Sequence, residues 1–468
     1  MTLYAYTNET FLTGPRTLVS HDQVMITGTG AVFCNSNVVF SALAATRLDF
    51  VVQGYVGTFD AVVTLGVSGA NSSATFNVGS TGTIAGYTGL ALVNTSAMVG
   101  NAGLITGRKF GVSLNDDLDQ TSKIVNSGTI HGAETGIFLS SFAASDNTIL
   151  NSGTISAGPY SVSGAAIDTD PTGASTDTVV NSGLISGSVR LGLGNDRLDN
   201  DGGRIQGAVD MGAGIDLVVN SGRISGAVLL GSDNDVYETA GAGLAEGTIS
   251  GGTGNDRFII GLAQETYAGD GGSDYLDFRK SGAVTVALDR SVEGTGAAEG
   301  DSYSGIEHVF GSRNGDDMLI GSSVANRLFG IGGNDILNGL GGQDSLDGGQ
   351  GIDTLTGGLG NDTFVFAKPG QAGDVITDFS STGAGNNDRL AISADGFGGG
   401  LALGTLAGAY FRARPDNEAQ DGNDRVIFNT ASRTVWFDAD GSGAGEAVLV
   451  ATLQVTADFT AADVFVIA

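Results

Sequence analysis

Cysteine, proline and histidine are scarce in this chain, which contains one Cys, five Pro and three His among 468 residues. A single thiol, Cys34, excludes an intramolecular disulfide. The histidines, His21, His131 and His308, lie far apart, and none begins the H-E-x-x-H motif of zinc proteases. The G-x-S-x-G motif of lipases is also missing. These absences argue against an enzyme, and we expect no catalytic residues.

Basic residues are few as well, because 21 Lys and Arg oppose 51 Asp and Glu and leave a formal charge of −30. Such a chain would be repelled by phosphates, so we expect no nucleic-acid partner. No apolar run is long enough for a transmembrane helix. The first residues, MTLYAYTNETFLTGPR, lack a basic region followed by an apolar stretch. We therefore expect no cleavable secretory signal.

Glycine is abundant instead, with 78 residues, and Val, Ile, Thr, Asn and Ser dominate between the glycines. Long runs of Leu, Glu, Lys and Ala, which favour helices, are missing. This composition is typical of an all-β protein with many turns.

A nine-residue repeat occupies residues 312–365 in six consecutive units: SRNGDDMLI, GSSVANRLF, GIGGNDILN, GLGGQDSLD, GGQGIDTLT and GGLGNDTFV. Four units match G-x-x-G-x-D-x-U-x, where U is a large apolar residue. The first unit lacks only the initial glycine, and the second has Val324 and Asn326 at the inner Gly and Asp positions. We expect U to enter a narrow core from a short strand, while glycine permits the sharp turns.

Two such units should complete one coil, so that Asp residues eighteen positions apart stack along one edge. One predicted edge contains Asp317, Asp335 and Asp353, and the other contains Asn326, Asp344 and Asp362. Carboxylates and turn carbonyls together form the all-oxygen shell that Ca²⁺ prefers. Asn326 supplies an oxygen without charge, so we expect a weaker site there.

A looser repeat precedes the nonapeptides. It reads STGTIAG, NAGLITG, NSGTIHG, NSGTISA, NSGLISG, NDGGRIQG and NSGRISG, with starts 19 to 30 residues apart. One coil of a parallel β-solenoid needs about this many residues, so we expect the Asn side chains to stack and the Ile side chains to point inward. The later coils also contain LGLGNDRLD, MGAGIDLVV and LGSDNDVYE, and the nonapeptides GGTGNDRFI and GDGGSDYLD follow.

The nonapeptides resemble those of the RTX (repeats-in-toxin) family, whose repeats form a calcium-binding parallel β-roll. The sequence after Val365 is similar to the C-terminal region of RTX proteins exported by type I secretion, with Asp463 before the apolar residues 464–467. The resemblance covers roughly residues 190–468. It implies several bound Ca²⁺ ions, the type I secretion machinery as a partner, and a secreted protein that is extracellular or on the cell surface.

A further calcium site is predicted at Asp438 and Asp440, because DADGS resembles the start of an EF-hand loop, although Leu449 stands at position 12. The candidate calcium ligands are therefore Asp196, Asp216, Asp235, Asp256, Asp274, Asp317, Asn326, Asp335, Asp344, Asp353, Asp362, Asp438 and Asp440.

The predicted fold is all-β: a parallel β-solenoid, or β-helix, that grades into a calcium-binding RTX parallel β-roll with a C-terminal β cap. We expect an N-terminal β cap or assembly region at residues 1–78, the NSG-repeat solenoid at 79–250, the RTX β-roll at 251–365 with an interlude at 278–311, and a C-terminal RTX cap with the type I secretion signal at 366–468.

The expected function is that of a secreted calcium-binding structural protein. It would fold on extracellular Ca²⁺ and self-assemble as a homo-oligomer or polymer, forming a surface layer, a filament or a matrix component. This design is similar to calcium-dependent bacterial surface-layer proteins. Two alternatives stay open. One is an RTX adhesin with a cell-surface polysaccharide as partner, and the other is a β-helix polysaccharide epimerase or lyase with an RTX tail. The only Asp-Pro pair, Asp170-Pro171, precedes Thr172 rather than the His of those epimerases.

Overall fold

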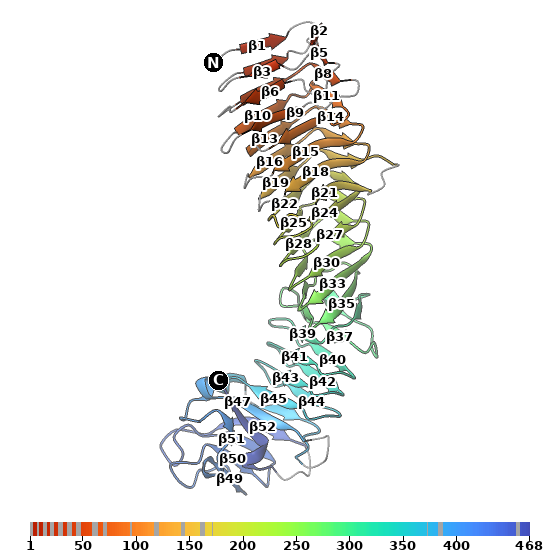
Figure 1. Ribbon diagram of the computed structural model, residues 1–468. Coiled ribbons are helices and arrows are strands. Elements are labelled where there is room, and N and C mark those ends of the chain that lie inside the picture. Colours follow the sequence, from red (N-terminus) through yellow and green to blue (C-terminus); the bar gives the residue numbers. More distant parts are fainter. Residues whose placement is uncertain are drawn as a thin grey trace. The chain divides into compact units, whose positions relative to one another are not determined.

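The computed structural model describes most of the chain in two compact units (Figure 1). The described residues are 3–6, 9–12, 16–18, 23–26, 31–34, 40–43, 48–58, 64–68, 73–93, 96–116, 121–141, 146–159, 164–170, 172–371, 373–381, 387–454 and 459–468. Unit 1 comprises Met1–Arg257 and Glu265–Gly272, and unit 2 comprises Phe258–Gln264 and Ser273–Ala468.

Unit 1 is a parallel β-solenoid in which each coil contributes one strand to each of three sheets. The first sheet contains β1 (Leu3–Tyr6), β4 (Gln23–Ile26), β7 (Leu48–Val52), β10 (Ser73–Val78), β13 (Ser96–Asn101), β16 (Ser122–Asn126), β19 (Asn147–Asn151), β22 (Thr178–Asn181), β25 (Arg197–Asn200), β28 (Leu217–Asn220) and β31 (Val236–Thr239).

The second sheet contains β2 (Glu9–Leu12), β5 (Ala31–Cys34), β8 (Tyr55–Thr58), β11 (Thr83–Gly86), β14 (Leu104–Gly107), β17 (Thr129–Gly132), β20 (Thr154–Ala157), β23 (Leu184–Ser186), β26 (Arg204–Ile205), β29 (Arg223–Ile224) and β32 (Leu244–Ala245). The third contains β3 (Arg16–Leu18), β6 (Phe40–Leu43), β9 (Thr64–Ser68), β12 (Leu90–Val93), β15 (Phe110–Asp116), β18 (Thr135–Ser141), β21 (Ala165–Thr169), β24 (Ser188–Arg190), β27 (Val209–Asp210), β30 (Val228–Ser232), β33 (Thr248–Gly254) and β35 (Thr266–Gly272). The predicted parallel β-solenoid is thus confirmed.

The isoleucines of the NSG repeats form the core of unit 1, as predicted. They stack in register along the second sheet and are almost completely buried: Ile84, Ile105, Ile130, Ile155, Ile185, Ile205 and Ile224. Apolar side chains that repeat at one position per coil bury a continuous core that no single coil could bury alone.

The asparagines of the same repeats form a buried hydrogen-bonded ladder, which was also predicted. Each Nδ2 donates to the Oδ1 of the next coil: Asn101 to Asn126 at 2.7 Å, and Asn126 to Asn151, Asn151 to Asn181, Asn181 to Asn200 and Asn200 to Asn220 at 2.8 Å. An amide suits this position because it carries both a donor and an acceptor, so one residue type bonds to coils on both sides.

We predict that Asn151→Ala destabilises unit 1 strongly. The substitution removes two buried hydrogen bonds, from Asn126 Nδ2 to Asn151 Oδ1 and from Asn151 Nδ2 to Asn181 Oδ1, and leaves the two neighbours with only longer bonds to backbone groups. Each hydrogen bond lost costs about 0.5–1.5 kcal/mol. Thermal unfolding followed by circular dichroism measures the loss. The control is Ser152→Ala at the exposed adjacent position, which removes only one 3.3 Å hydrogen bond to the Asn126 carbonyl. Equal melting temperatures for the two variants would contradict a stabilising ladder.

The strands within residues 1–78 pair in parallel with the same three sheets, through β1–β4, β4–β7 and β7–β10 in the first of them. The sequence showed no repeat here because these coils lack the NSG signature. A role of this region in capping or assembly stays a prediction.

Unit 2 contains a roll with two strands per coil. One sheet contains β36 (Tyr275–Asp277), β39 (His308–Phe310), β41 (Arg327–Phe329), β43 (Ser345–Asp347), β45 (Thr363–Phe366), β47 (Arg389–Ser393) and β53 (Val464–Ile467), with β48 (Gly404–Thr405) antiparallel to β53. The other contains β37 (Thr285–Ala287), β40 (Met318–Ser322), β42 (Ile336–Leu340), β44 (Thr354–Thr356), β46 (Asp374–Ile376) and β52 (Val448–Leu453).

The apolar U positions fill the core of this roll. Leu319, Leu328, Leu337, Leu346, Leu355 and Phe364 are all fully buried. They alternate between the two sheets, and residues eighteen positions apart are paired, as in Leu319–Leu337 and Leu328–Leu346. The predicted coil of two nonapeptides is therefore confirmed.

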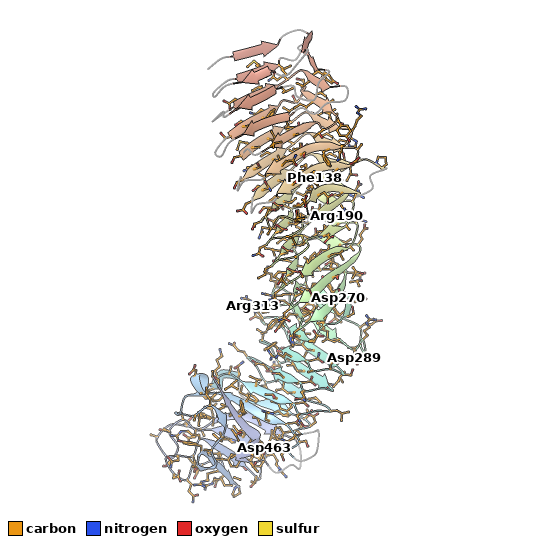
Figure 2. The ribbon with its side chains drawn as sticks, viewed as in Figure 1. Phe138, Arg190, Asp270, Asp289, Arg313 and Asp463 are labelled. Atoms are coloured by element: carbon orange, nitrogen blue, oxygen red, sulfur yellow. The ribbon has the colours of Figure 1, made fainter. Side chains whose placement is uncertain are left out.

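Antiparallel strands and short helices follow the roll. β51 (Thr434–Phe437) pairs with β52 and β50 (Val426–Asn429), and β49 (Phe411–Arg414) pairs with β50. Asp463, labelled in Figure 2, accepts hydrogen bonds from the backbone nitrogen and hydroxyl of Thr460 just before β53. In the described part of the chain α1 (Ala394–Phe397) is the only α-helix, and no helix there is long and apolar enough to cross a membrane.

The remaining elements are short. β34 (Arg257–Ile259) spans the boundary of the two units, and β38 (Ser302–Ser304) lies in the interlude with the 3₁₀ helix η1 (Gly296–Ala298). Three more 3₁₀ turns follow, η2 (Pro369–Gln371), η3 (Gly408–Tyr410) and η4 (Ala461–Asp463).

Candidate metal centre

The candidate ligands of the nonapeptides form two columns in unit 2, each residue standing directly before a strand. In one column the Asp335 Oδ1 accepts from the Asp317 nitrogen at 2.8 Å, and the Asp353 Oδ1 accepts from the Asp335 nitrogen at 2.7 Å. In the other, Asp344 Oδ1 accepts from the Asn326 nitrogen at 2.8 Å, and Asp362 Oδ1 from the Asp344 nitrogen at 2.9 Å. The two predicted edges are confirmed.

Unit 1 contains a third column with the same geometry. The nitrogens of Asp196, Asp216 and Asp235 donate to the Oδ1 atoms of Asp216, Asp235 and Asp256 at 2.7, 2.7 and 2.9 Å. All four aspartates are among the calcium ligands that the sequence predicted. We call the three columns the aspartate ladders.

The second carboxylate oxygen is the unusual feature of the ladders. Seven residues that are at most 2% exposed have a buried Oδ2 atom with no hydrogen-bond partner: Asp196, Asp216, Asp235, Asp335, Asp344, Asp353 and Asp362. A buried carboxylate oxygen without a partner is strongly unfavourable in a low-dielectric interior. A hard cation satisfies such an oxygen, so these side chains fit Ca²⁺.

Backbone oxygens would have to complete any such site. In the described residues no three His, Cys, Asp or Glu side chains gather into one cluster. Each ladder instead presents carboxylates from neighbouring coils beside turns rich in glycine carbonyls. Carboxylates combined with carbonyls are an ordinary oxygen shell for Ca²⁺.

The two glycines of the nonapeptide pattern serve different purposes. A side chain at Gly330, the first glycine, would collide with the Asp335 Oδ2 atom of the same unit. Gly351, an inner glycine, has φ of 139°, and a side chain there would collide with the carbonyl oxygen of Gly333 on the preceding coil. The first glycine therefore makes room for the carboxylate, while the inner glycine allows the coils to approach closely.

The first nonapeptide does have its initial glycine, contrary to the sequence analysis. A side chain at Gly311 would collide with Asp317 Oδ2, which places Gly311 in the role of the first glycine with one extra residue inserted after it. That residue, Ser312, donates its backbone nitrogen to Asp317 Oδ2 at 2.6 Å. Asp317 is therefore fully hydrogen-bonded, unlike the members that follow it.

Asn326 is also satisfied by protein groups alone. Its Oδ1 accepts from the Ser322 nitrogen at 2.7 Å, and its Nδ2 donates to the Glu307 carbonyl at 3.0 Å. A neutral amide at a ladder position thus needs no cation, which provides an internal comparison for the charged members.

Four further acidic residues belong to the ladders but were not predicted from the sequence. Glu307 accepts from the Asp274 nitrogen at 3.0 Å and shows that SYSGIEHVF is a degenerate nonapeptide. The Asp177 nitrogen donates to Asp196, while Asp374 and Asp388 accept from the nitrogens of Asp353 and Asp362. Asp177, Asp374 and Asp388 lie 19, 21 and 26 residues from their ladder neighbours, which is close to the length of one coil, and this spacing could have identified them from the sequence.

Asp438 and Asp440 lie away from the ladders. Asp438 Oδ1 accepts from the Asp440 nitrogen at 3.1 Å, and Asp440 Oδ2 accepts from the Gly445 nitrogen at 3.1 Å. Leu449 belongs to β52. The loop is therefore closed by its own hydrogen bonds, and a calcium site there stays a prediction.

Burial raises the pKa of the ladder aspartates, and it raises the pKa of five of the predicted ligands far above the usual range. The pKa of Asp196 and Asp235 rises to about 8, and that of Asp216, Asp335 and Asp344 to about 7. Desolvation is the main cause, and neighbouring ladder carboxylates raise the pKa of four of them further. Without a cation, the ladders therefore tend to hold protons at neutral pH.

These shifts predict that the metal-free protein is more stable in mild acid than in mild base. Between the unfolded pKa of 3.8 and the folded value of about 7 to 8, the folded state binds more protons than the unfolded state. Stability therefore falls as pH rises through that window. In chelator the melting temperature should be higher at about pH 5 than at about pH 8. With saturating calcium the trend should flatten or reverse, because metal binding requires deprotonated carboxylates. A melting temperature in chelator that rises with pH would contradict the expected sign.

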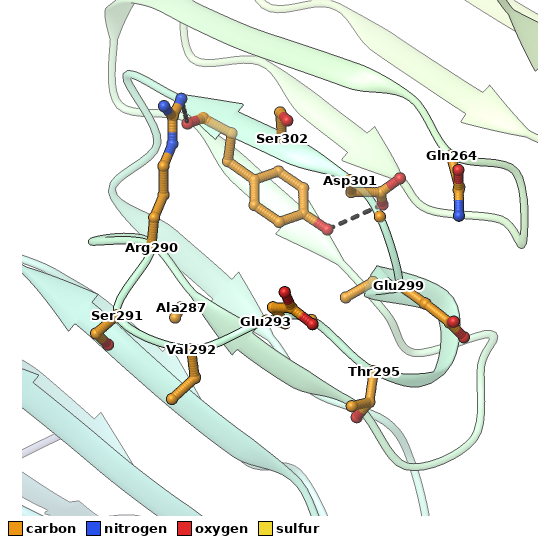
Figure 3. Close-up of a pocket in the computed structure, with 14 residues that line it drawn as sticks. Gln264, Ala287, Arg290, Ser291, Val292, Glu293, Thr295, Glu299, Asp301 and Ser302 are labelled. Carbon is orange, nitrogen blue, oxygen red and sulfur yellow. Dashed lines mark hydrogen bonds between the residues drawn. The ribbon is translucent and has the colours of Figure 1, made fainter.

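The interlude of unit 2 encloses a separate cavity of about 770 Å³ (Figure 3). The Tyr303 hydroxyl donates to Asp301 at 2.9 Å, and the Arg290 guanidinium donates to the Tyr303 carbonyl at 3.0 Å. Both interactions hold the chain of the interlude itself, so the cavity follows from how this segment folds. We assign it no role.

The three aspartate ladders can thus act as linear arrays of cation sites between coils, in which each carboxylate is fixed by one backbone hydrogen bond. No protein-family model matches this chain, and no curated protein matches it either.

Proposed function

We propose that this chain is a secreted structural protein whose aspartate ladders bind Ca²⁺ and thereby complete its folding outside the cell. The seven buried Oδ2 atoms without hydrogen-bond partners carry this proposal. Bound Ca²⁺ would neutralise the stacked carboxylates and link successive coils. Asp335, Asp344, Asp353 and Asp362 would hold it in unit 2, and Asp196, Asp216 and Asp235 in unit 1.

Calcium-dependent folding is compatible with export of the chain in an unfolded state. Where calcium is scarce, buried carboxylates disfavour the folded coils and the glycine-rich backbone gains conformational entropy by staying unfolded. An unfolded chain suits passage through the type I machinery, which the resemblance of the C-terminal region to RTX proteins implies. Extracellular calcium modules bind at about 10⁻⁴ to 10⁻³ M, so binding would occur after export.

We further propose that the folded protein assembles into a surface layer, filament or matrix. An apolar column on the outer face of the first sheet of unit 1 supports assembly. Val125 is 40% exposed and pairs in register with Leu150, which pairs with Val180. Met98, in a neighbouring column of the same face, is 51% exposed and pairs in register with Lys123. An apolar column such as that of Val125, Leu150 and Val180 favours contact with another protein surface.

Assembly predicts ordered sheets or filaments in calcium, visible by negative-stain microscopy, and their loss in chelator. Val125→Glu combined with Met98→Glu should prevent assembly without changing the melting temperature in calcium. Ala133→Glu, at an exposed position between β17 and β18, adds the same kind of charge on another face and should leave assembly intact. Monodisperse protein at every calcium concentration would contradict the proposal.

A further inference from the structure

A groove of about 490 Å³ lies on the outer face of the third sheet of unit 1. Phe138, Asp168, Arg190 and Asp210 line it, together with Leu193 and Ala213. Figure 2 labels Phe138 and Arg190, which come from β18 and β24. Neither the nonapeptides nor the NSG repeats include these four side chains.

The four side chains form a single column across four successive coils. Phe138 pairs in register with Asp168, Asp168 with Arg190, and Arg190 with Asp210. Neighbouring strands are about 4.8 Å apart, so the column extends over about 14 Å. The groove is therefore shaped for an extended ligand that lies along the stack of coils.

An aromatic ring begins the column. Phe138 stacks on Phe110 with ring centroids 4.7 Å apart and planes 8° from parallel. This stacking fixes the ring at the side of the groove, where it offers an apolar surface. Aliphatic C–H groups of a ligand can pack on such a surface.

Carboxylates and one guanidinium continue the column. Arg190 Nη1 lies 3.8 Å from Asp168 Oδ1, and Asp170 and Asp210 also line the groove. Carboxylates accept hydrogen bonds and guanidinium donates them, so the row suits groups that do both, such as hydroxyls. Three acids beside one base disfavour an anionic ligand.

We propose that this groove binds an extended neutral oligosaccharide. Sugar rings carry C–H faces for Phe138 and hydroxyls for the polar row, and a linear chain matches a column built from four coils. A polysaccharide-binding site supports the adhesin alternative, in which the protein attaches to a glycan surface.

The groove is also connected to an aspartate ladder. Leu193 and Ala213, which line the groove, form a parallel bridge and lie in the turns that lead to Asp196 and Asp216. Glycan binding should therefore need the calcium-loaded coils, and in this respect the inference rests on the proposed function.

The test is calorimetric titration of the full chain in saturating calcium with malto-, cello- and manno-oligosaccharides of increasing length, and with oligogalacturonate as the anionic probe. We expect one neutral series to bind, with an affinity that rises with length until the groove is filled. Phe138→Ala and Arg190→Ala should each reduce the affinity about tenfold or more, while Leu262→Ala, at an exposed position of unit 2, should leave it unchanged.

Failure to bind any neutral oligosaccharide overturns the inference, as does equal binding by wild type and Phe138→Ala. Preference for oligogalacturonate overturns the neutral class, and binding of single sugars without a length dependence overturns the extended geometry. Calcium-dependent melting, measured on the same samples, separates this failure from that of the proposed function. Protein that melts higher in calcium but binds no glycan leaves the calcium proposal standing.

Discussion

Transfer of the full chain from saturating calcium into chelator should unfold the roll of unit 2 at ambient temperature. Each site that binds the folded state adds about 1.4 kcal/mol when calcium is tenfold above its dissociation constant. Four such sites, one for each of the unit 2 residues Asp335, Asp344, Asp353 and Asp362, would add about 6 kcal/mol, which is comparable to the whole stability of a typical domain. Loss of β-type circular dichroism and of the calcium-dependent melting transition would measure the effect.

Magnesium provides the control for this experiment. Mg²⁺ demands a small octahedral shell and gives up water reluctantly, so it should not restore the spectrum at concentrations where calcium does. Identical spectra and melting curves in calcium and in chelator would contradict calcium-dependent folding.

Asp335→Asn combined with Asp353→Asn should uncouple folding from calcium along one ladder. Asn326 shows that a neutral amide at a ladder position is satisfied by protein groups alone. At about pH 8, above the raised pKa of Asp335 of about 7, the substitutions remove buried carboxylate charge and should raise the metal-free stability by about 1–3 kcal/mol for each unpaired carboxylate oxygen removed. The number of bound calcium ions should fall at the same time. Chemical unfolding in chelator and calorimetric calcium titration measure the two effects.

Asp316→Asn is the control, because it makes the same type of substitution one residue from the first ladder. Asp316 is exposed, and its Oδ1 accepts from the Asn334 nitrogen at 2.7 Å. One coil further on, Asn334 Oδ1 accepts the equivalent hydrogen bond from the Ile352 nitrogen at 2.9 Å. An asparagine at position 316 can therefore accept the hydrogen bond from the Asn334 nitrogen as Asp316 does. Calcium stoichiometry should stay as in the wild type, and metal-free stability should change less than in the ladder variant, because the Asp316 charge only adds to the raised pKa of Asp335 and Asp353. A ladder variant that behaves like Asp316→Asn would contradict a ligand role for Asp335 and Asp353.

The periodic parts of the fold were predictable because each repeat position has one physical task. Leu337 and Asp335 are two residues apart, so the periodicity that predicted a buried Leu column also predicted the carboxylate column beside it. The recurrence of Asn and Ile in the NSG repeats likewise predicted the asparagine ladder and the buried isoleucines. Glu307 escaped prediction because the interlude places it 33 residues after Asp274, outside the eighteen-residue period.

The groove could not be predicted from repeats at all. Its column joins residues 30, 22 and 20 positions apart, since loops of different length connect the strands of these coils. Only the strand register aligns Phe138, Asp168, Arg190 and Asp210. Side chains on the outer face also differ from coil to coil, because they are not constrained by the core.

The asparagine ladder has a consequence for how such a chain can evolve. Its bonds join equivalent positions of successive coils, while the distance between those positions in the sequence varies from 19 to 30 residues. Insertions between the ladder residues therefore lengthen surface loops without disturbing the frame. If one whole coil is gained or lost, counted from one ladder Asn to the next, the flanking Asn side chains can still hydrogen-bond to each other. If only part of a coil is gained or lost, an Asn position is missing and the ladder is interrupted. Gene duplication in units of a coil is thus the change in length that this architecture accepts most easily.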